Sequence, residues 1–266
     1  MNYRMKLWAG IGAAALMQAS WMDKAAVASP QQPIMLVAAG GEAGEGGEGG
    51  EAGIDPAAAR TDPVVFITAL DVIRAHYLAG QRAYAAGDKT AAHELFVHPI
   101  SEVYVDLKPV LEERGGTDMM PTLEKAGEVA SQGKPRAEID AVVKEVLVAV
   151  DKAETFAPPG KDPLAINAAL LSEFLGRAAQ QYSTARKSTE DEPYLDGLGL
   201  YLVAKQRADR QMKALVAKSP DAAKKVAAAL NELVKAYPGA KAPSNKPEMP
   251  AMLAAVSTAQ LALSGL

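Results

Sequence analysis

The most constraining feature of this chain is a helical spacing of apolar residues that proline and glycine interrupt at regular intervals. From Asp62 onward, apolar side chains recur three and four residues apart, which places them on one face of a helix. The composition agrees, because 49% of the residues are hydrophobic but only 5% are aromatic, a balance that favours close-packed helices over a β-sandwich. The sequence therefore predicts an all-α fold, an antiparallel bundle of about seven or eight helices.

Proline marks the start of most expected helices, because its fixed φ suits the first helical position. Thr61-Asp62-Pro63 places a capping residue directly before proline, and Gly87-Asp88 ends the helix that begins there. His98 is expected to be the N-cap of a helix that begins at Pro99, since a residue before proline avoids the α conformation. The other helices are expected over residues 90–97, 121–131, 135–156, 163–187, 193–218, 220–237 and 250–264.

Small residues on several predicted helix faces would let neighbouring helix axes approach closely. These residues are Ala69, Ala79, Ala83, Gly197 and Gly199. The sequence therefore predicts a tightly packed bundle.

Residues 1–28 have the features of a secretory signal peptide. Two basic residues precede an apolar run over residues 7–17, which is too short to span a bilayer. Ala26-Val27-Ala28 offers the small residues that signal peptidase needs, and cleavage after Ala39 is the alternative. The sequence therefore predicts export to the periplasm with no stable membrane span after cleavage, while an uncleaved signal anchor is the other reading.

Residues 29–60 are predicted to be a flexible linker, and residues 61–266 the helical domain. Residues 40–53 consist of glycine, glutamate and alanine, so this part has no large apolar side chain to bury. A loose site for hard cations on its carboxylates is the alternative to a solvated tether. The domain folds either as one bundle or as two sub-bundles that divide near residues 157–162, where two prolines and a glycine interrupt the helical pattern.

The absence of cysteine and the acidic charge exclude several classes of protein. No disulfide can form, and covalent haem attachment through a Cys-x-x-Cys-His motif is ruled out. The formal net charge of -4 argues against nucleic acid and anionic lipid as partners. The sequence contains no nucleophile elbow, phosphate-binding loop, dinucleotide fingerprint or His-Glu-x-x-His zinc motif, so we expect no enzymatic activity.

All three histidines of the chain, His76, His93 and His98, fall within residues 76–98. Imidazole is the commonest metal ligand, and its pKa lies near neutrality. His76 lies on an apolar stripe of the first predicted helix, so burial would keep it neutral and able to bind a metal. The alternative is a core histidine that is hydrogen-bonded to a backbone carbonyl or a carboxylate across the bundle.

His98 is the second candidate metal ligand, because Glu94 and Glu102 stand four residues before and after it. The three side chains share one face if the helix continues through Pro99 with only a kink. Imidazole and carboxylate at this spacing can surround one ion, whereas a solvated ion pair or a helix cap is the alternative. On a straight helix His93 would point about 140° away from His98, so His93 is expected at the surface and is a weaker candidate, as is Glu94.

A longer pattern combines histidine with small and aromatic residues. It comprises His76-Tyr77-Leu78-Ala79-Gly80, Tyr84, Gly87-Asp88, Ala92-His93, Phe96, His98-Pro99, Glu102, Tyr104 and Leu107, then Ala178-Ala179-Gln180-Gln181-Tyr182, Pro193-Tyr194-Leu195-Asp196 and Gly199. Over residues 62–215 the chain resembles the soluble periplasmic region at the N-terminus of some bacterial Ftr-type iron permeases. That resemblance implies an exported helical domain that handles a metal ion, with His76, His98, Glu102 and Asp196 as site residues.

Two hypotheses about function follow. The Arg-Glu-x-x-Glu motif and the membrane spans of a permease are absent, as is the Gly-x-His-x-x-Glu motif of the more distantly similar imelysin-like proteins. The first hypothesis is a periplasmic protein that binds an iron or copper ion, or haem, and delivers it to a periplasmic or inner-membrane transport protein. It predicts that His76 and His98 lie close together. The alternative is a non-catalytic helical interaction module, which predicts scattered structural histidines and an exposed apolar face.

Overall fold

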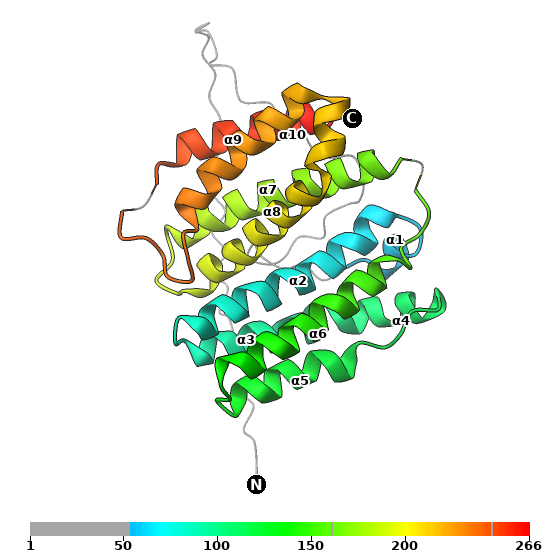
Figure 1. The fold of residues 1–266 in the computed structure, drawn as a ribbon, viewed down its shortest axis with the longest axis vertical. Coiled ribbons are helices and arrows are strands. Elements are labelled where there is room, and N and C mark those ends of the chain that lie inside the picture. The colour runs from blue at the N-terminus through cyan, green and yellow to red at the C-terminus, as the bar shows by residue number, and fades with distance from the viewer. Residues whose placement is uncertain (1–53, 161, 246) are drawn as a thin grey trace, which may run out of the picture. The chain divides into compact units, whose positions relative to one another are not determined.

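The computed structural model describes residues 54–160, 162–245 and 247–266, so the predicted signal peptide and most of the predicted linker lie outside the described residues. Within the described residues every regular element is a helix, which confirms the predicted all-α fold (Figure 1). The elements are α1 (Pro56–Ala59), α2 (Pro63–Ala85), α3 (Lys89–Pro99), the π-helix η1 (Ile100–Tyr104), α4 (Val105–Glu113), α5 (Met120–Ser131), α6 (Arg136–Glu154), α7 (Pro163–Ala185), α8 (Glu192–Lys218), α9 (Pro220–Ala236) and α10 (Met249–Leu263).

Most of the proline signals mark helix starts as predicted, with Pro99 as an exception. Asp62 precedes Pro63 at the start of α2, and Asp162 precedes Pro163 at the start of α7. In both helices the aspartate side chain accepts a hydrogen bond of 2.8 Å from the backbone N–H two residues later. These bonds satisfy a backbone donor that has no partner within the helix.

The prediction that His98 caps a new helix at Pro99 is wrong. Asp88 is the N-cap of α3, and His98 lies inside that helix near its end. Pro99 has no N–H to donate, yet the chain stays helical because η1 follows directly, with the N–H of Val105 bonded to the carbonyl of Ile100, five residues back. A π turn therefore absorbs the disturbance that was expected to end the helix.

The predicted linker boundary at residue 60 is also too late. Asp55-Pro56 repeats the capping signal found at the start of α2, and it begins the single turn α1. Ala59 in this turn is fully buried. Arg60 forms an ion pair with Glu113 at the end of α4, with 2.9 Å between Nε and Oε2. Ordered packing therefore begins before residue 61, because α1 has both a cap and a buried contact.

The long helices pack in two groups that share α2. One group contains α3, α5 and α6 together with α2, and the other contains α7, α8, α9 and α10 (Figure 1). Residues 155–162 connect α6 to α7, near the point where the sequence suggested a division. Since α2 packs against α3 and α6 on one side and against α7 and α8 on the other, the two groups form one unit.

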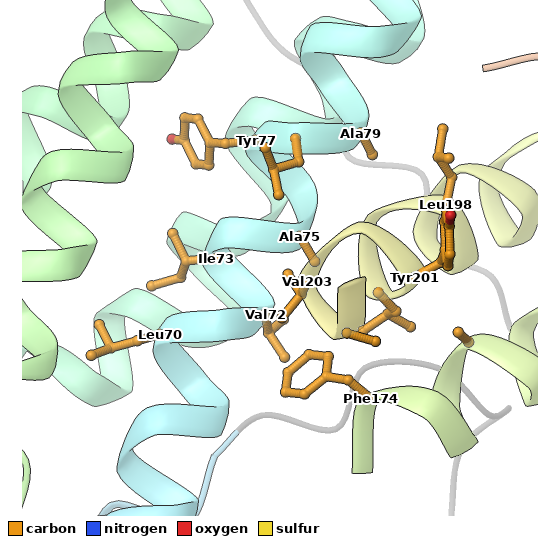
Figure 2. Packing of buried hydrophobic residues seen from close by; sticks show 14 of the residues in the cluster. Leu70, Val72, Ile73, Ala75, Tyr77, Ala79, Phe174, Leu198, Tyr201 and Val203 are labelled. Atoms are coloured by element: carbon orange, nitrogen blue, oxygen red, sulfur yellow. The ribbon is translucent and has the colours of Figure 1, made fainter. Parts of the chain in front are cut away.

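The central position of α2 explains its composition. This helix is long and apolar enough to cross a membrane by those two criteria alone, but most of it is buried inside the bundle. A helix with apolar residues on more than one side is typical of such a core position. Figure 2 shows its side chains pointing to both sides, with Leu70, Ile73 and Tyr77 toward the first group and Val72, Ala75 and Ala79 toward α8.

The close packing expected from small residues is found at two glycines of α8. A Cβ atom added to Gly199 would overlap the backbone carbonyl oxygen of Ala75. A Cβ added to Gly197 would overlap the hydroxyl of Tyr237, which donates a hydrogen bond of 2.7 Å to the carbonyl of Ala178. At these two positions of α8 only glycine lets the neighbours come so near.

Three charged side chains also meet in the core between α2 and α8. Asp71, fully buried, accepts hydrogen bonds from Nε of Arg74 at 3.2 Å and from Nε of Arg207. Both guanidinium groups reach carboxylates of α6, since Nη2 of Arg74 lies 2.9 Å from Asp151 and Nη2 of Arg207 lies 3.3 Å from Glu154. Burial acts to lower the pKa of Arg207, but the attraction of Asp71 and Glu154 outweighs it and raises the pKa. This network ties α2, α6 and α8 together.

Gly199→Ala is expected to lower the free energy of unfolding by about 1–3 kcal/mol, because a backbone carbonyl cannot move aside as a side chain can. Gly239→Ala is the matched control, since no heavy atom lies within 4 Å of the position that its Cβ would take. Urea denaturation of both variants measures the difference. Equal stability of the two variants would contradict the close contact of α2 with α8.

Arg207→Met is expected to cost roughly 3–5 kcal/mol of stability, because it leaves the buried Asp71 with one partner fewer. Arg210→Met is the control, since it removes a half-exposed ion pair with Asp151 and should cost roughly 0–1 kcal/mol. The same denaturation measurement compares them. If both substitutions cost equally little, the buried network does not hold α8 in place.

Candidate functional site

A cavity of about 340 Å³ lies between the two helix groups, and its lining is strongly acidic. One wall comes from α3 and the residue before it, and the other comes from the start of α8 and the two residues before that helix. The lining residues are Asp88, Thr90, Ala91, Glu94, Leu95, His98, Glu190, Asp191, Glu192 and Leu195. Five of these carry carboxylates and none carries lysine or arginine, so the cavity favours a cationic ligand.

His98 is the nitrogen ligand that this cavity offers. Its Nδ1 lies 3.7 Å from Oε1 of Glu192, and the two side chains are 35% and 63% exposed. A protonated His98 would form an ion pair across the cavity, whereas a neutral His98 could give a lone pair to a metal ion. Glu94 lies one turn before His98 on α3 and lines the same space.

The positive ends of two helices partly offset the acidic charge. Asp88 is the N-cap of α3, and its side chain accepts a hydrogen bond of 3.0 Å from the N–H of Ala91. Asp191 is the N-cap residue of α8, and Glu192 lies in the first turn of that helix. Carboxylates are stabilised at helix N-termini, so part of this cluster also serves to stabilise α3 and α8. A cation in the cavity would feel less attraction than five free carboxylates would exert.

His76 lies elsewhere, buried in the core with 3% of its surface exposed. Its Nδ1 is 2.9 Å from the carbonyl oxygen of Val72, one turn back on α2. Because a carbonyl can only accept, Nδ1 carries the proton, and in the neutral ring the lone pair is on Nε2. His76 is not among the residues that line the acidic cavity, so the two histidines of the predicted site are not brought together there.

His93 also bonds to a backbone carbonyl, which corrects its expected position at the surface. Its Nδ1 lies 3.0 Å from the carbonyl oxygen of Gly127 on α5, and its side chain is half-buried. Helix α5 packs against α3 and covers the face that carries His93. The sequence could not show this, because a helical spacing gives the direction of a side chain but not the helix that faces it.

The two other predicted ligands, Glu102 and Asp196, are half-buried and do not line the cavity. Glu102 lies in η1 and Asp196 lies in α8. The pKa of Tyr237 is raised mainly by burial, with smaller effects from two neighbouring tyrosines and from Asp196. Over residues 54–160, 162–245 and 247–266, no three His, Asp or Glu side chains are arranged closely enough to hold a metal ion as they stand.

The structure therefore brings together only part of the predicted site. His98 and Glu94 line one cavity, and the other wall adds Glu190, Asp191 and Glu192. The sequence signal for these three was the polar break over residues 188–192, which indicated only a connection between helices. Their place opposite α3 depends on the packing of α8 against α2.

The chain matches no family model, no curated protein and no solved structure. The resemblance to the periplasmic region of Ftr-type iron permeases therefore stays a prediction from the sequence. Inference about function depends on the cavity and on the residues around it.

A second, smaller cavity of about 170 Å³ is lined in part by the carboxylate of Asp118. Its Oδ2 lies 2.7 Å from Nζ of Lys108, and its Oδ1 accepts bonds from the hydroxyl of Tyr104 at 2.7 Å and the N–H of Met120 at 2.9 Å. The bonds from Lys108 and Tyr104 lower the pKa of Asp118 to about 2. The carboxylate thus stays charged at neutral pH and holds the start of α5.

The lowered pKa of Asp118 predicts that the folded protein loses stability in acid. Its folded pKa of about 2 lies below the ordinary value of 3.8, so its contribution is complete above about pH 4 and is lost as the pH falls toward 2. The difference in unfolding free energy between the wild type and Asp118→Asn should therefore shrink over that range. Denaturation at a series of pH values measures it, and a difference that is constant from pH 6 to pH 2 would contradict the assignment.

Proposed function

We propose that this chain is a non-catalytic helical protein that binds a metal cation in the acidic cavity, with His98, Glu94 and Glu192 as ligands. The observation that carries the proposal is the convergence of one imidazole and five carboxylates on a cavity whose lining has no basic side chain. Cation binding in this place would join the two helix groups, since each contributes one wall.

The ligand chemistry supports an ion that accepts both nitrogen and oxygen. Imidazole suits iron, copper and zinc, and carboxylate oxygens suit harder cations. The cavity lining contains no methionine, and the chain contains no cysteine, so copper(I) is a poor fit. Iron ions and copper(II) therefore fit this donor set better than copper(I) does.

The size and the charge of the cavity favour a metal ion over haem as the ligand. A volume of about 340 Å³ is near the lower end of the roughly 300–1,000 Å³ found for small-molecule sites. Haem carries two propionate groups, and these would meet carboxylates on both walls. An apolar macrocycle would also gain little from this lining, in which carboxylates outnumber the two leucines.

The affinity is expected to be modest. The hydrogen bond that Asp88 accepts and the positive helix ends reduce the attraction for a cation. The ligand side chains must also move to complete a site, since no three of them among the described residues are close enough as they stand. Side-chain ordering of this kind opposes binding. We expect a dissociation constant of about 10⁻⁴–10⁻³ M for a hard cation such as calcium or magnesium, and tighter binding for ions that use the imidazole.

The proposal also covers the location of the protein and the partner that would receive its metal ion. The segment resembling a signal peptide supports export to the periplasm. A protein that releases its ion readily would suit delivery to a periplasmic or inner-membrane transport protein, as the family resemblance implies. Both parts depend on metal binding at the cavity.

Isothermal titration calorimetry with copper(II), zinc(II), iron(II) and manganese(II) tests the site. We expect affinities in the order copper(II), zinc(II), iron(II), manganese(II), and a loss of about tenfold or more in His98→Ala/Glu94→Gln. Glu138→Gln, at an exposed carboxylate of α6, is the control and should bind as the wild type does. Absence of binding, or equal binding by the double variant, would overturn the proposal.

A second candidate is the interaction module with structural histidines. It is favoured by the bonds from His76 and His93 to backbone carbonyls, because such bonds are how core histidines are satisfied. It predicts that the wild type and His98→Ala/Glu94→Gln titrate alike with every metal ion. The calorimetric experiment therefore separates the two functions.

A further inference from the structure

The wall of the acidic cavity that carries Glu192 has little local support. Glu192 begins α8, and its side chain is 63% exposed. Asp191, the N-cap residue of this helix, makes no capping hydrogen bond with its side chain. A helix start without a side-chain cap depends on contacts with the rest of the protein to keep its place.

Tyr194 provides a directional contact of this kind for the first turn of α8. Its side chain is buried, and its hydroxyl donates a hydrogen bond of 2.7 Å to the carbonyl of Gly239. The carbonyl oxygen of Lys241 lies 3.2 Å from the same hydroxyl. Both acceptors belong to the segment that joins α9 to α10. The start of α8 is therefore tied to a part of the chain about 45 residues further on.

The segment between α9 and α10 is itself fixed, so it can serve as an anchor. At its start, Tyr237 is buried, and its hydroxyl donates a hydrogen bond of 2.7 Å to the carbonyl of Ala178 on α7. Arg186, directly after α7, donates a hydrogen bond of 2.5 Å from Nη1 to the carbonyl of Pro247. The ring of Tyr194 packs against that of Tyr237, with 5.3 Å between the ring centroids. The segment is thus held at both ends.

Leu195, the other buried residue of this turn, cannot replace the contact of Tyr194. Its side chain lines the cavity and is 3% exposed, but apolar contacts have no preferred direction. A hydrogen bond requires its donor and acceptor to be aligned, so the bond from Tyr194 restricts how far the turn can rotate. Such a rotation would move the carboxylate of Glu192 away from His98, which now lies 3.7 Å from it.

We propose that Tyr194 is a positioning residue for the metal site, which holds Glu192 opposite His98 without touching the ion. This inference rests on the proposed function, because it treats Glu192 as a metal ligand. Residues that orient a ligand from outside the site affect the affinity for the metal. The bond from Tyr194 couples the cavity to the α9–α10 segment, which contributes no residue to the lining.

Tyr194→Phe tests this role, because it removes the hydroxyl and keeps the ring. Calorimetric titration with copper(II) should show an affinity about threefold to tenfold lower than that of the wild type. Tyr182→Phe is the matched control. Tyr182 also packs against Tyr237, with ring centroids 5.6 Å apart, but its buried hydroxyl has no hydrogen-bond partner among the described residues. The control should bind copper(II) as the wild type does.

A double variant separates positioning of the ligand from a general loss of stability. In a Glu192→Gln background, Tyr194→Phe should change the affinity for copper(II) by less than about twofold, since the carboxylate that it orients is already gone. A general loss of stability would lower the affinity equally in both backgrounds. That result, or an unchanged affinity in the single variant Tyr194→Phe, would overturn the proposal.

Hydrogen–deuterium exchange of the metal-free protein adds a measurement that does not depend on metal binding. The amides of residues 195–198 should exchange about threefold to tenfold faster in Tyr194→Phe than in Tyr182→Phe, because the first turn of α8 opens more often. Unchanged exchange in α6 would show that the fold is retained. Equal exchange of residues 195–198 in a protein that binds copper(II) would overturn the positioning role alone. A wild type that binds no ion would overturn the proposed function, and the positioning role with it.

Discussion

The buried carboxylate of Asp71, held between Arg74 of its own helix and Arg207 of α8, is the contact on which the rest of the arrangement depends. A buried charge is costly unless it keeps its partners, so this network tolerates little displacement of α8 along α2. Hydrophobic packing alone would leave more freedom, because apolar contacts have no preferred direction. Because Gly199 has no side chain, α8 approaches α2 so closely at this point that its position along α2 is fixed.

The acidic cavity is a consequence of this packing at the other end of α8. Once α8 lies against α2, its N-terminus faces α3 from Asp88 to His98, and both helix starts carry carboxylates for local reasons. The carboxylates that stabilise the starts of α3 and α8 thus come together to line one acidic cavity. The cavity is lined by five carboxylates, although several of them taken singly would be explained by their helix.

The histidines show how neighbouring residues acquire different roles. They are close in sequence, but His76 faces the core, His93 faces α5 and His98 faces the cavity. Their clustering in the sequence suggested one site, and the structure distributes them among three environments. Chain proximity on a helix constrains direction, whereas chemical environment depends on whichever element packs against each face.

The sequence by itself determined the helices, most of their starts and the need for close packing, because caps, proline and apolar spacing act within a few residues. Asp62-Pro63 and Asp162-Pro163 carry the whole signal for two helix starts. The prediction from the sequence failed at His98, where a π turn after Pro99 replaced the expected helix break. The meeting of Glu94 and His98 with Glu192 was decided only by the tertiary structure, since it joins residues about a hundred positions apart. Such contacts depend on the summed packing of α2 with α8, which no local pattern specifies.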